Sequence, residues 1–327
     1  MPVKKQAIPM SRLDFEKPIL ELEHKIIELK TIDSKKYVNI GPEIKKLEDK
    51  LVKLRAQIYG NLTAWQRIQI ARHPDRPYTL DYIRLIAEDF VEVHGDRLFA
   101  DDYALVAGFA TIDKQKVFVM GHQKGRDVKE NVMRNFGCAH PEGYRKAMRL
   151  MKMAEKFNLP VVIFIDTPGA YPGIGAEERG QAQAIATNLM EMADVAIPIV
   201  AFVIGEGGSG GALGIGVADR VVILQHAYYS VISPEGCASI LWRNSVRAPD
   251  AAKALRIMGE DLLEFGIVDE MIEEPLGGAH RDPESVAAAV KKTALKHIKK
   301  LVTLSKEDLL VDRYERFRKI GRFDENK

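Results

Sequence analysis

A glycine-rich segment at residues 203–216, with the sequence VIGEGGSGGALGIG, most constrains how this chain can fold. Five of the seven residues from 205 to 211 are glycine, and an apolar run directly precedes them. Only Glu206 and Ser209 carry functional side chains in that stretch. Glycine adopts backbone conformations that other residues avoid and lets main chains approach closely. The pattern therefore predicts a buried strand that runs into a glycine loop and then opens a short helix.

The region that contains this loop alternates between strand-like and helix-like patterns. Apolar runs rich in β-branched residues predict strands at 103–113, 116–123, 159–167, 197–205 and 220–226. Helical spacing of apolar residues predicts helices at 141–158 and 176–194. The first two strands look paired and the later ones look buried. This order favours an α/β fold with helices packed on a largely buried sheet.

Helices without strands are predicted near the N-terminus. In the run at 15–30, Leu20 and Ile27 lie at helical spacing. Residues 41–60 carry a second amphipathic pattern that closes at Gly60. Charged helices with one apolar face need a surface to cover, so we expect them to pack on their own domain or to form a subunit contact.

A proline-rich boundary separates these helices from the α/β region. Pro74 and Pro77 interrupt helix formation, and Thr79 can cap the next helix. After residue 280 the chain becomes helical and basic, and its lysines from 291 to 300 indicate a solvated helix face. We therefore divide the chain into a helical region at 1–76, an α/β domain at 77–280 and a C-terminal helical region at 281–327.

Composition argues against several kinds of partner. The formal net charge is only +2, so bulk electrostatics gives no reason to expect nucleic acid. Cys138 and Cys237 lack neighbours at ligand spacing, so we expect no metal site or disulfide framework within this chain. No run approaches the roughly 18 apolar residues of a membrane span. We expect a soluble cytoplasmic protein without a membrane partner.

A second loop, TPGAYPG at 167–173, follows the predicted strand at 159–167. Loops at strand ends are where α/β folds place their sites, although a connection stiffened by prolines is an equal interpretation. Residues 166–169 also match the Asp-x-x-Gly element of a GTPase, which requires a phosphate loop containing Gly-Lys. The sequence contains no Gly-Lys dipeptide, and this argues against a GTPase.

The glycine loop itself allows three interpretations. Residues 207–211 match G-x-S-x-G, the elbow of a serine hydrolase with Ser209 as nucleophile, and His226, His280 or His297 could complete a triad. No HGGG-type oxyanion segment precedes it. Alternatively, the glycine amides and a helix N-terminus hold a developing oxyanion. The third interpretation is a tight turn that only permits close helix packing.

Two further motifs carry charged side chains. In GHQKGR, the cations His122, Lys124 and Arg126 could meet an anionic carboxylate or phosphate, although a surface hairpin end also explains them. In SVISPEGCASILW, Ser233 or Pro234 starts a helix, and its first turn contains Glu235. Helix capping accounts for Glu235 by itself.

Together these motifs resemble one family, the alpha subunit of the bacterial acetyl-CoA carboxylase carboxyltransferase. The matching segments occur in family order and cover most of the chain from residue 73 to residue 281. They are HPDRPYTLDYI, GHQKGR, PEGYRKA, IDTPGAYPG, AEERGQ, IGEGGSGGAL, YSVISPEGCASILW and EPLGGAHR. The resemblance implies a crotonase-like (ClpP/crotonase) α/β fold, a superhelix of β-β-α turns with helical additions at both ends.

The resemblance also implies a biotin-dependent carboxyltransferase reaction. A carboxyl group passes from carboxybiotin, borne on the biotin carboxyl carrier protein, to acetyl-CoA, and this gives malonyl-CoA for fatty-acid synthesis. The family works as an α2β2 assembly with a carboxyltransferase beta subunit, and biotin carboxylase belongs to the wider complex. Zinc is expected on the beta subunit only, and no cofactor is expected to be bound covalently to this chain.

By the same resemblance, the alpha subunit faces biotin and the beta subunit faces the thioester. We assign the donors that stabilise the biotin enolate to the amides of Gly207 and Gly208. Gly210 and Gly211 either add donors or only permit close packing. The residues expected to shape the biotin end are Thr167, Pro168, Gly169, Ala170, Tyr171, Pro172 and Gly173. Lys124 and Arg126 are weaker candidates for contacts to CoA.

Two rival functions stay open from the sequence. An acyl-CoA hydratase or hydrolase of crotonase fold would need side-chain carboxylates in its cleft and would turn over without biotin. A non-catalytic binding subunit would need only to assemble with its partner.

Overall fold

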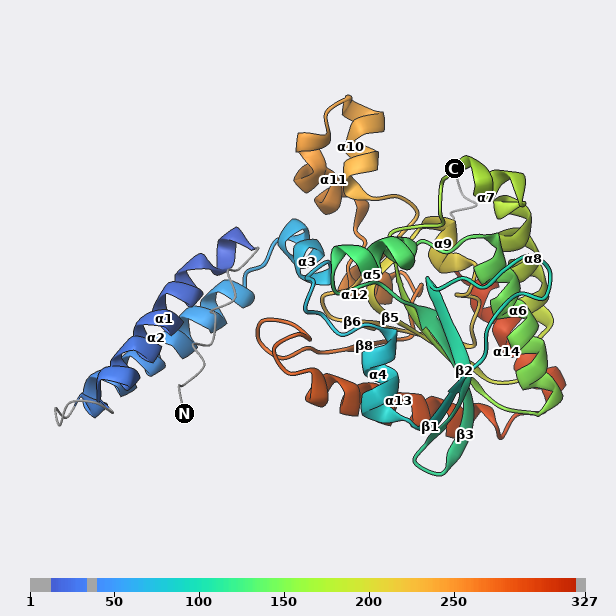
Figure 1. The fold of residues 1–327 in the computed structure, drawn as a ribbon, viewed down its shortest axis with the longest axis horizontal. Coiled ribbons are helices and arrows are strands. Elements are labelled where there is room, and N and C mark those ends of the chain that lie inside the picture. The colour runs from blue at the N-terminus through green and yellow to red at the C-terminus, as the bar shows by residue number, and fades with distance from the viewer. Residues whose placement is uncertain (1–12, 34–39, 322–327) are drawn as a thin grey trace, which may run out of the picture.

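The computed structural model describes residues 13–33 and 40–321, in which an α/β body carries helical extensions (Figure 1). The strands are β1 Glu88–Glu92, β2 Leu105–Ile112, β3 Gln115–His122, β4 Val161–Thr167, β5 Ile199–Gly208, β6 Arg220–Leu224, β7 Tyr228–Ser230 and β8 Glu270–Ile272. The helices before β4 are α1 Lys17–Asp33, α2 Gly41–Tyr59, α3 Ala64–Ala71, α4 Thr79–Ile86, α5 Val128–Met133 and α6 Pro141–Lys156. Those after β4 are α7 Ile174–Glu178, α8 Gln181–Asp194, α9 Ser209–Leu213, α10 Pro234–Trp242, α11 Ala248–Leu255, α12 Gly259–Glu264, α13 Pro283–Leu301 and α14 Lys306–Arg318.

One mixed sheet forms the centre of the body. Its strand order is β1-β2-β3-β4-β5-β6-β8, with β7 paired to β5. The pairs β1–β2 and β2–β3 are antiparallel, whereas every pair from β3 onward is parallel. Helices α4 and α13 cover one face, and α6, α8 and α14 lie on the other (Figure 1). Strands β4 and β5 are buried along their whole length because helices cover both faces.

The long strand β5 changes its neighbour part-way along. Its first part, 200–203, pairs with β6, and its last part, 206–208, pairs with β7. The predicted glycine loop is therefore not a loop. Residues 205–208 continue β5, and Ser209 begins α9. Glycine usually weakens a strand interior, but here both neighbouring strands supply pairing partners, and this pairing holds the extended conformation.

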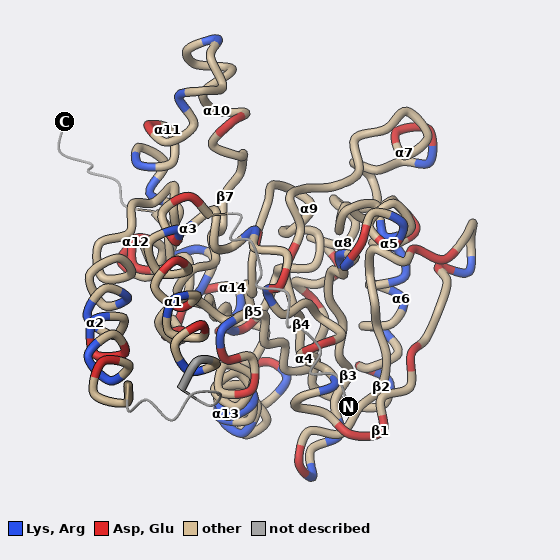
Figure 2. Tube along the Cα trace, turned by 60° about the vertical axis from the view of Figure 1, so that its left-hand side comes forward, with Lys and Arg blue, Asp and Glu red and all other residues tan. Residues whose placement is uncertain are grey.

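The N-terminal helices α1 and α2 form a hairpin that stands beside the body (Figure 1). Figure 2 shows basic and acidic residues interspersed along α2. The apolar face of α1 differs from the predicted one, since Ile19 and Ile26 are buried whereas Ile27 is exposed and Leu20 is only half-buried. Helix α1 therefore packs through a different face, whose buried residues precede the predicted ones by one position.

The C-terminal helices pack more deeply than their basic composition predicts. Helix α13 buries one face against the body, while Lys292, Lys296, Lys299 and Lys300 stay exposed, which confirms the predicted solvated face. Helix α14 inserts Arg313, whose guanidinium pairs with Asp219 at 2.8 Å and donates to three backbone carbonyls at the end of α8 and beyond. A buried arginine thus anchors the C-terminal region to the sheet.

Two predicted helix boundaries are wrong. The run at 176–194 is two helices, because Gly180 adopts a left-handed conformation (φ 80°) between α7 and α8. Thr79 is the first residue of α4 and not its cap, because its hydroxyl donates to the backbone oxygen of His122. Asp81 instead accepts from the Tyr78 amide at 2.9 Å.

None of the described helices is both long and apolar enough to cross a membrane. The domain division at residues 76 and 280 stays a prediction.

Candidate functional site

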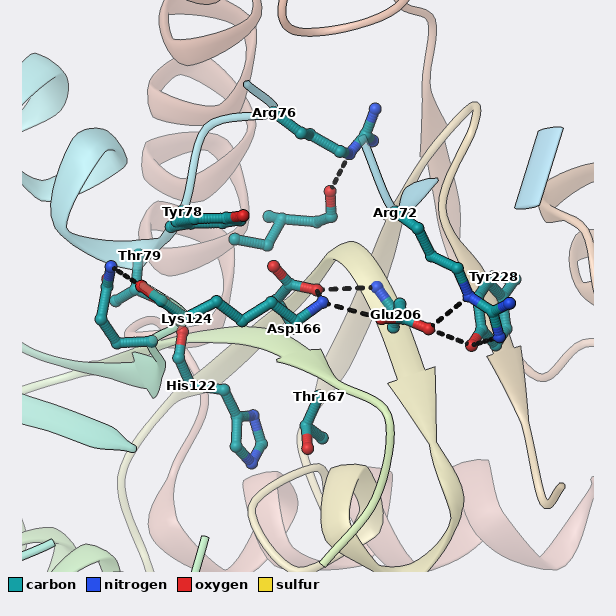
Figure 3. A network of polar contacts seen from close by, with 12 residues as sticks. Arg72, Arg76, Tyr78, Thr79, His122, Lys124, Asp166, Thr167, Glu206 and Tyr228 are labelled. Carbon is teal, nitrogen blue, oxygen red and sulfur yellow. Dashed lines mark hydrogen bonds and ion pairs between the residues drawn. The ribbon is translucent and has the colours of Figure 1, made fainter. Parts of the chain in front are cut away.

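The carboxyl ends of β3, β4 and β5 bring three charged side chains together (Figure 3). Lys124 follows β3, Asp166 lies near the end of β4, and Glu206 lies on β5. The Lys124 ammonium lies 2.6 Å from Asp166 Oδ1 and 2.9 Å from Glu206 Oε1. Because parallel strands end at the same edge of a sheet, residues that are 82 positions apart in sequence share one buried ion cluster.

The cluster extends through Glu206 to the far side of β5 (Figure 3). Glu206 Oε2 accepts from Arg72 Nε at 2.7 Å and from the Tyr228 hydroxyl at 2.6 Å. Arg72 also donates to Glu235 Oε1 at 2.5 Å, so Glu235 does more than cap α10. Arg72 follows α3 and Tyr228 starts β7, so the ion cluster joins the N-terminal helices, the sheet and α10.

The charges in this cluster stabilise one another. Burial alone would raise the pKa of Glu206, but Lys124 and Arg72 lower it to about 2. Burial opposes the charged form of Lys124, yet the carboxylates of Asp166 and Glu206 raise its pKa. Burial, together with the charge of Lys124, lowers the pKa of His122 to about 3 and keeps its ring neutral. Glu206 and Lys124 therefore stay ionised at neutral pH.

Asp166 also shapes the backbone where the glycines begin. The register between β4 and β5 shifts between Ile165 and Thr167, and Asp166 Oδ1 accepts from the Glu206 amide at 2.9 Å across this irregularity. A Cβ atom on Gly205 would lie 2.5 Å from Asp166 Oδ1. Glycine at 205 is therefore required for the carboxylate to sit there.

The glycines of the segment have different neighbours. A Cβ atom on Gly208 would lie 2.2 Å from the Pro168 oxygen, and one on Gly211 would lie 2.4 Å from the Ala170 nitrogen. Gly207 lies in register between Thr167 of β4 and Tyr229 of β7. By contrast, a Cβ atom on Gly210 would come no closer than 3.8 Å, to the Ile185 side chain. Backbone contact with the TPGAYPG loop thus explains Gly208 and Gly211 but not Gly210.

The TPGAYPG loop, residues 167–173, lies directly against this segment. It closes on itself through Thr167, whose hydroxyl donates to the Gly169 oxygen at 2.7 Å and accepts from its amide. The Tyr171 ring stacks on His140 with centroids 4.1 Å apart, and the Tyr171 amide donates to the Ala139 oxygen. The structure therefore brings together the two stretches that the sequence predicted to form one site.

The junction between β5 and α9 is the accessible part of the glycine segment. Ser209 is exposed and Gly210 half-buried, whereas residues 205–208 are buried. Ser209 has a positive φ of 55°, unusual for a residue with a side chain, and it turns the main chain from strand to helix. Helix α9 has only five residues, so the predicted help from a helix dipole is limited to little more than one turn.

An apolar hollow of about 560 Å³ opens beside Ser209 and Gly210. Its other walls include Tyr229, Leu255, Phe265 and Phe317. Main-chain amides at the edge of an apolar hollow are the arrangement that suits a ligand with a flat apolar body and one polar oxygen.

The serine-hydrolase interpretation finds no support in the geometry. Among the described residues, no hydrogen bond joins Ser209 to a histidine. The His280 ring stacks on His73 at 4.0 Å, and His297 Nε2 lies 2.8 Å from Glu270 Oε2. His226 is buried, and its backbone amide donates to Glu274. The three candidate histidines are thus held in other parts of the body.

Lys124 and Arg126 make intramolecular contacts that the sequence did not predict. Lys124 pairs with the carboxylates of Asp166 and Glu206. Arg126 pairs with Asp81, donates to the Pro74 oxygen at 2.6 Å and lies over the Tyr78 ring at 4.0 Å. A contact from either cation to CoA stays a prediction, and it would have to compete with these partners.

A second buried ion pair was missed in the sequence. Arg76 donates to both carboxylate oxygens of Glu274, at 2.7 and 2.6 Å, and its Nε donates to the Ile204 oxygen on β5. Both side chains are almost fully buried. Two of the quoted motifs, HPDRPYTLDYI and EPLGGAHR, therefore meet behind the glycine segment. The signal available in the sequence was a charged residue of each sign, Arg76 and Glu274, within two proline- and glycine-containing motifs.

The comparisons with known proteins agree with this architecture. The family model described as "Acetyl co-enzyme A carboxylase carboxyltransferase-like" matches residues 12–321. The acetyl-coenzyme A carboxylase carboxyl transferase subunit alpha of Geobacter metallireducens is 56% identical over 96% of this chain and 98% of its own length. The protein of the same name from Azotobacter vinelandii is 59% identical over 95% and 98%.

The chain belongs to the acetyl-coenzyme A carboxylase carboxyltransferase family. The family predicted from the motifs is confirmed, and with it the expectation that the chain is a component of a biotin-dependent carboxyltransferase.

Solved structures of low identity share the fold. Transcarboxylase 12S, with methylmalonyl-coenzyme A and methylmalonic acid bound, superposes with a TM-score of 0.52 at 24% identity, over 68% of this chain and 44% of that one. The beta subunit of Pseudomonas aeruginosa geranyl-CoA carboxylase gives a TM-score of 0.53 at 14% identity, over 80% and 47%. The predicted crotonase-like fold is confirmed by these neighbours.

Proposed function

We propose that this chain is the alpha subunit of an acetyl-CoA carboxylase carboxyltransferase, in which it contributes to carboxyl transfer onto acetyl-CoA to form malonyl-CoA. The observation that carries this proposal is the match to alpha subunits over nearly the whole length of both chains, at 56% identity or more in the two cited relatives. The position of the glycine segment at the carboxyl ends of parallel strands supports it, since α/β folds bind ligands at that edge.

We infer that main-chain amides near the glycine segment donate to an anionic oxygen of biotin during transfer. Gly207 and Gly208 are the donors assigned from the sequence. Because Gly207 lies in register between two strands and the surface is reached at Ser209 and Gly210, we extend the candidates to the β5–α9 junction. One such donor typically contributes roughly 3 to 4 kcal/mol to lowering a barrier.

The polarity of the residues present suits a biotin head group. The hollow of about 560 Å³ has apolar walls, and the exposed main chain at 209–210 lies at its edge. Carboxybiotin, supplied by the biotin carboxyl carrier protein, would bring the carboxyl group that is transferred. The chain's own residues would orient that group and donate hydrogen bonds, and the TPGAYPG loop at 167–173 would hold the glycine segment in place.

The partners in this proposal are a carboxyltransferase beta subunit in an α2β2 assembly, the carrier protein and, in the wider complex, biotin carboxylase. Zinc would reside on the beta subunit, and this chain would bind no cofactor covalently. The cytoplasmic setting expected from the sequence belongs to the same proposal.

The rival crotonase-fold hydratase or hydrolase is not favoured. It would need open side-chain carboxylates as acid and base. The carboxylates of Asp166 and Glu206 at this edge of the sheet are almost fully buried and paired with Lys124. They are held as structural ions and are not open to an acyl-CoA substrate.

Reconstitution tests the proposal. The purified chain, a beta subunit and carboxylated carrier protein are mixed with acetyl-CoA, and malonyl-CoA is measured. We expect product only when all components are present. Full-rate transfer by the chain alone would contradict a site divided between subunits, and hydration or hydrolysis of acyl-CoA without biotin would support the rival function.

A further inference from the structure

The helices α10 and α11 form an arm that projects from the body, as Figures 1 and 2 both show. Val231, Ile240, Leu241 and Val246 on this arm are each more than 60% exposed. Its base is held by α11, where Ala252 packs with Ile68 and Ala71 of α3. The arm is therefore attached to the body through α3 and through the strand that precedes it.

That strand is β7, and it pairs directly with the glycine segment. Tyr228, Tyr229 and Ser230 lie opposite residues 206, 207 and 208 of β5. Only three residues separate the end of β7 from the start of α10. A change in the direction of the arm would therefore pull on the strand that flanks the predicted oxyanion donors.

Arg72 provides a second connection between the arm and the same segment, and Figure 3 shows its contact with Glu206. Its Nε donates to Glu206 at 2.7 Å, and its Nη1 donates to Glu235, in the first turn of α10, at 2.5 Å. Glu206 immediately precedes Gly207 and is itself almost fully buried. The guanidinium is planar and rigid, so it holds the two carboxylates in a fixed relation that a flexible lysine cannot reproduce.

We propose that Arg72 is a positioning residue that ties the α10–α11 arm to the glycine segment, so that the orientation of the arm sets the position of the main-chain donors. This inference rests on the proposed function only in giving those donors a role in carboxyl transfer. The physical coupling from Glu235 through Arg72 to Glu206 stands on the contacts alone.

Hydrogen–deuterium exchange of the full chain tests the coupling without an activity measurement. Arg72→Gln removes both charged contacts, and we expect amide exchange in the peptide 203–213 to rise about tenfold because local opening becomes easier. Glu235→Gln should raise exchange in the arm and, to a smaller extent, in 203–213. In the Arg72→Gln background, Glu235→Gln should add nothing at 203–213, because the connection is already broken.

Arg67 offers a matched control on α3, the helix that Arg72 follows. Its Nη1 pairs with Glu260 of α12 at 2.5 Å, away from Glu206. Arg67→Gln therefore removes an α3 ion pair of the same length without touching the glycine segment, and exchange at 203–213 should stay unchanged. Equal effects of Arg67→Gln and Arg72→Gln, or additive effects of Glu235→Gln and Arg72→Gln at 203–213, would overturn the inference.

Arg72→Lys keeps a positive charge and guards against a folding defect in Arg72→Gln. Exchange in α13 reports global opening, and it should not change in Arg72→Lys. We expect exchange at 203–213 to lie between that of the wild type and that of Arg72→Gln, because lysine can hold Glu206 but cannot bridge to Glu235. Wild-type exchange at 203–213 in Arg72→Lys would contradict a role for the guanidinium fork.

The reconstituted complex provides the functional readout. Arg72→Gln should lower kcat by about tenfold to a hundredfold, the scale of a small misplacement at a reacting centre, while KM for acetyl-CoA stays within about twofold. An unchanged kcat in Arg72→Gln would show that the arm does not affect carboxyl transfer, and it would overturn the catalytic part of the inference. If the wild-type complex itself transfers no carboxyl group, the proposed function fails, and the exchange measurements still decide the coupling.

Discussion

Lys124 shows how a single buried side chain holds three strand ends together. Its ammonium is the shared partner of Asp166 and Glu206, and its side chain is only 12% exposed. Two buried carboxylates near each other repel unless a cation lies between them. Lys124 therefore stabilises the site by pairing with both carboxylates.

Replacing this cation tests its structural role. Lys124→Met would leave two buried carboxylates without their common partner, and we expect the free energy of unfolding to fall by about 3 to 5 kcal/mol. Urea unfolding measures it. Lys292→Met, on the exposed face of α13, is the control and should change stability by less than about 0.5 kcal/mol. A loss below about 1 kcal/mol in Lys124→Met would contradict the role.

Buried neutral histidines predict that the protein loses stability in mild acid. Burial, the largest cause in each case, lowers the pKa of His122 and His280 to about 3 and that of His226 to about 4. In the unfolded chain a histidine titrates near pH 6.5, so the unfolded state binds more protons below that pH. The stabilisation is complete above about pH 6.5 and is lost as pH falls toward about 4 for His226 and about 3 for His122 and His280.

Urea unfolding at pH 7.5, 6.0 and 5.0 measures this dependence. Each histidine contributes up to about 1.4 kcal/mol per pH unit within its window. His122→Gln should make the pH dependence shallower, since one of the three groups no longer titrates. An unaltered slope in His122→Gln would show that His122 takes up no extra proton on unfolding.

At the scale of elements, the junction of β5 and α9 is defined by contact with the TPGAYPG loop. Gly208 and Gly211 face the backbone of that loop with no room for a side chain. The same loop holds its own shape through Thr167 and through stacking of Tyr171 on His140. The strand end, the helix start and the loop therefore form one packed unit.

Alanine substitutions within the segment should have opposite outcomes. In Gly208→Ala the new methyl group would collide with the Pro168 oxygen at 2.2 Å, and we expect a loss of about 1 to 3 kcal/mol. Gly210→Ala has space, with its nearest atom at 3.8 Å, and alanine favours the helix, so stability should be unchanged or should rise by up to about 1 kcal/mol. Thermal unfolding distinguishes them, and a larger loss in Gly210→Ala would contradict the packing described.

Helix α14 contributes Arg313 to a fully buried ion pair with Asp219. Arg313→Leu would leave Asp219 buried without its cation, and we expect a loss of about 3 to 5 kcal/mol by urea unfolding. The double variant Arg313→Leu with Asp219→Asn should lose less than the sum of the single variants, because the unpaired charge is removed. Strict additivity would show that the pair is not the main attachment of the helix.

At the scale of the whole molecule, the N-terminal hairpin lies outside the main core cluster of the body and packs instead with Ile70 of α3. The main core cluster begins at Tyr82, whereas Leu13, Ile19, Tyr59 and Ile70 form their own cluster. A chain that lacks residues 1–60 should therefore keep a folded body, recognisable by its near-ultraviolet circular dichroism. Exposure of the Ile70 side chain should cost no more than about 3 kcal/mol. Loss of the tertiary signal would make the hairpin an integral part of the fold.

Periodicity and motifs predicted much of this molecule. The strands that became β2 to β6 and the helices α1, α2 and α6 form where the sequence pattern predicts them, since their signals are local and repeat over many residues. Short elements such as β7 and β8 have only three residues each and carry too little pattern to be found. The site assignments to Gly207, Gly208 and the TPGAYPG loop stay predictions, although the structure brings these residues into contact.

The sequence by itself determined the α/β class and the family, and it located the glycine segment at 205–211 whose main-chain role stays a prediction. Only the tertiary structure decided that this segment is the end of a strand, that Gly208 and Gly211 are glycine because a second loop lies against them, and that Lys124, Asp166, Glu206 and Arg72 form one ion cluster. The physical reason is that periodicity reports the conformation of neighbours along the chain, whereas charge pairing and backbone contact join residues 40 or more positions apart.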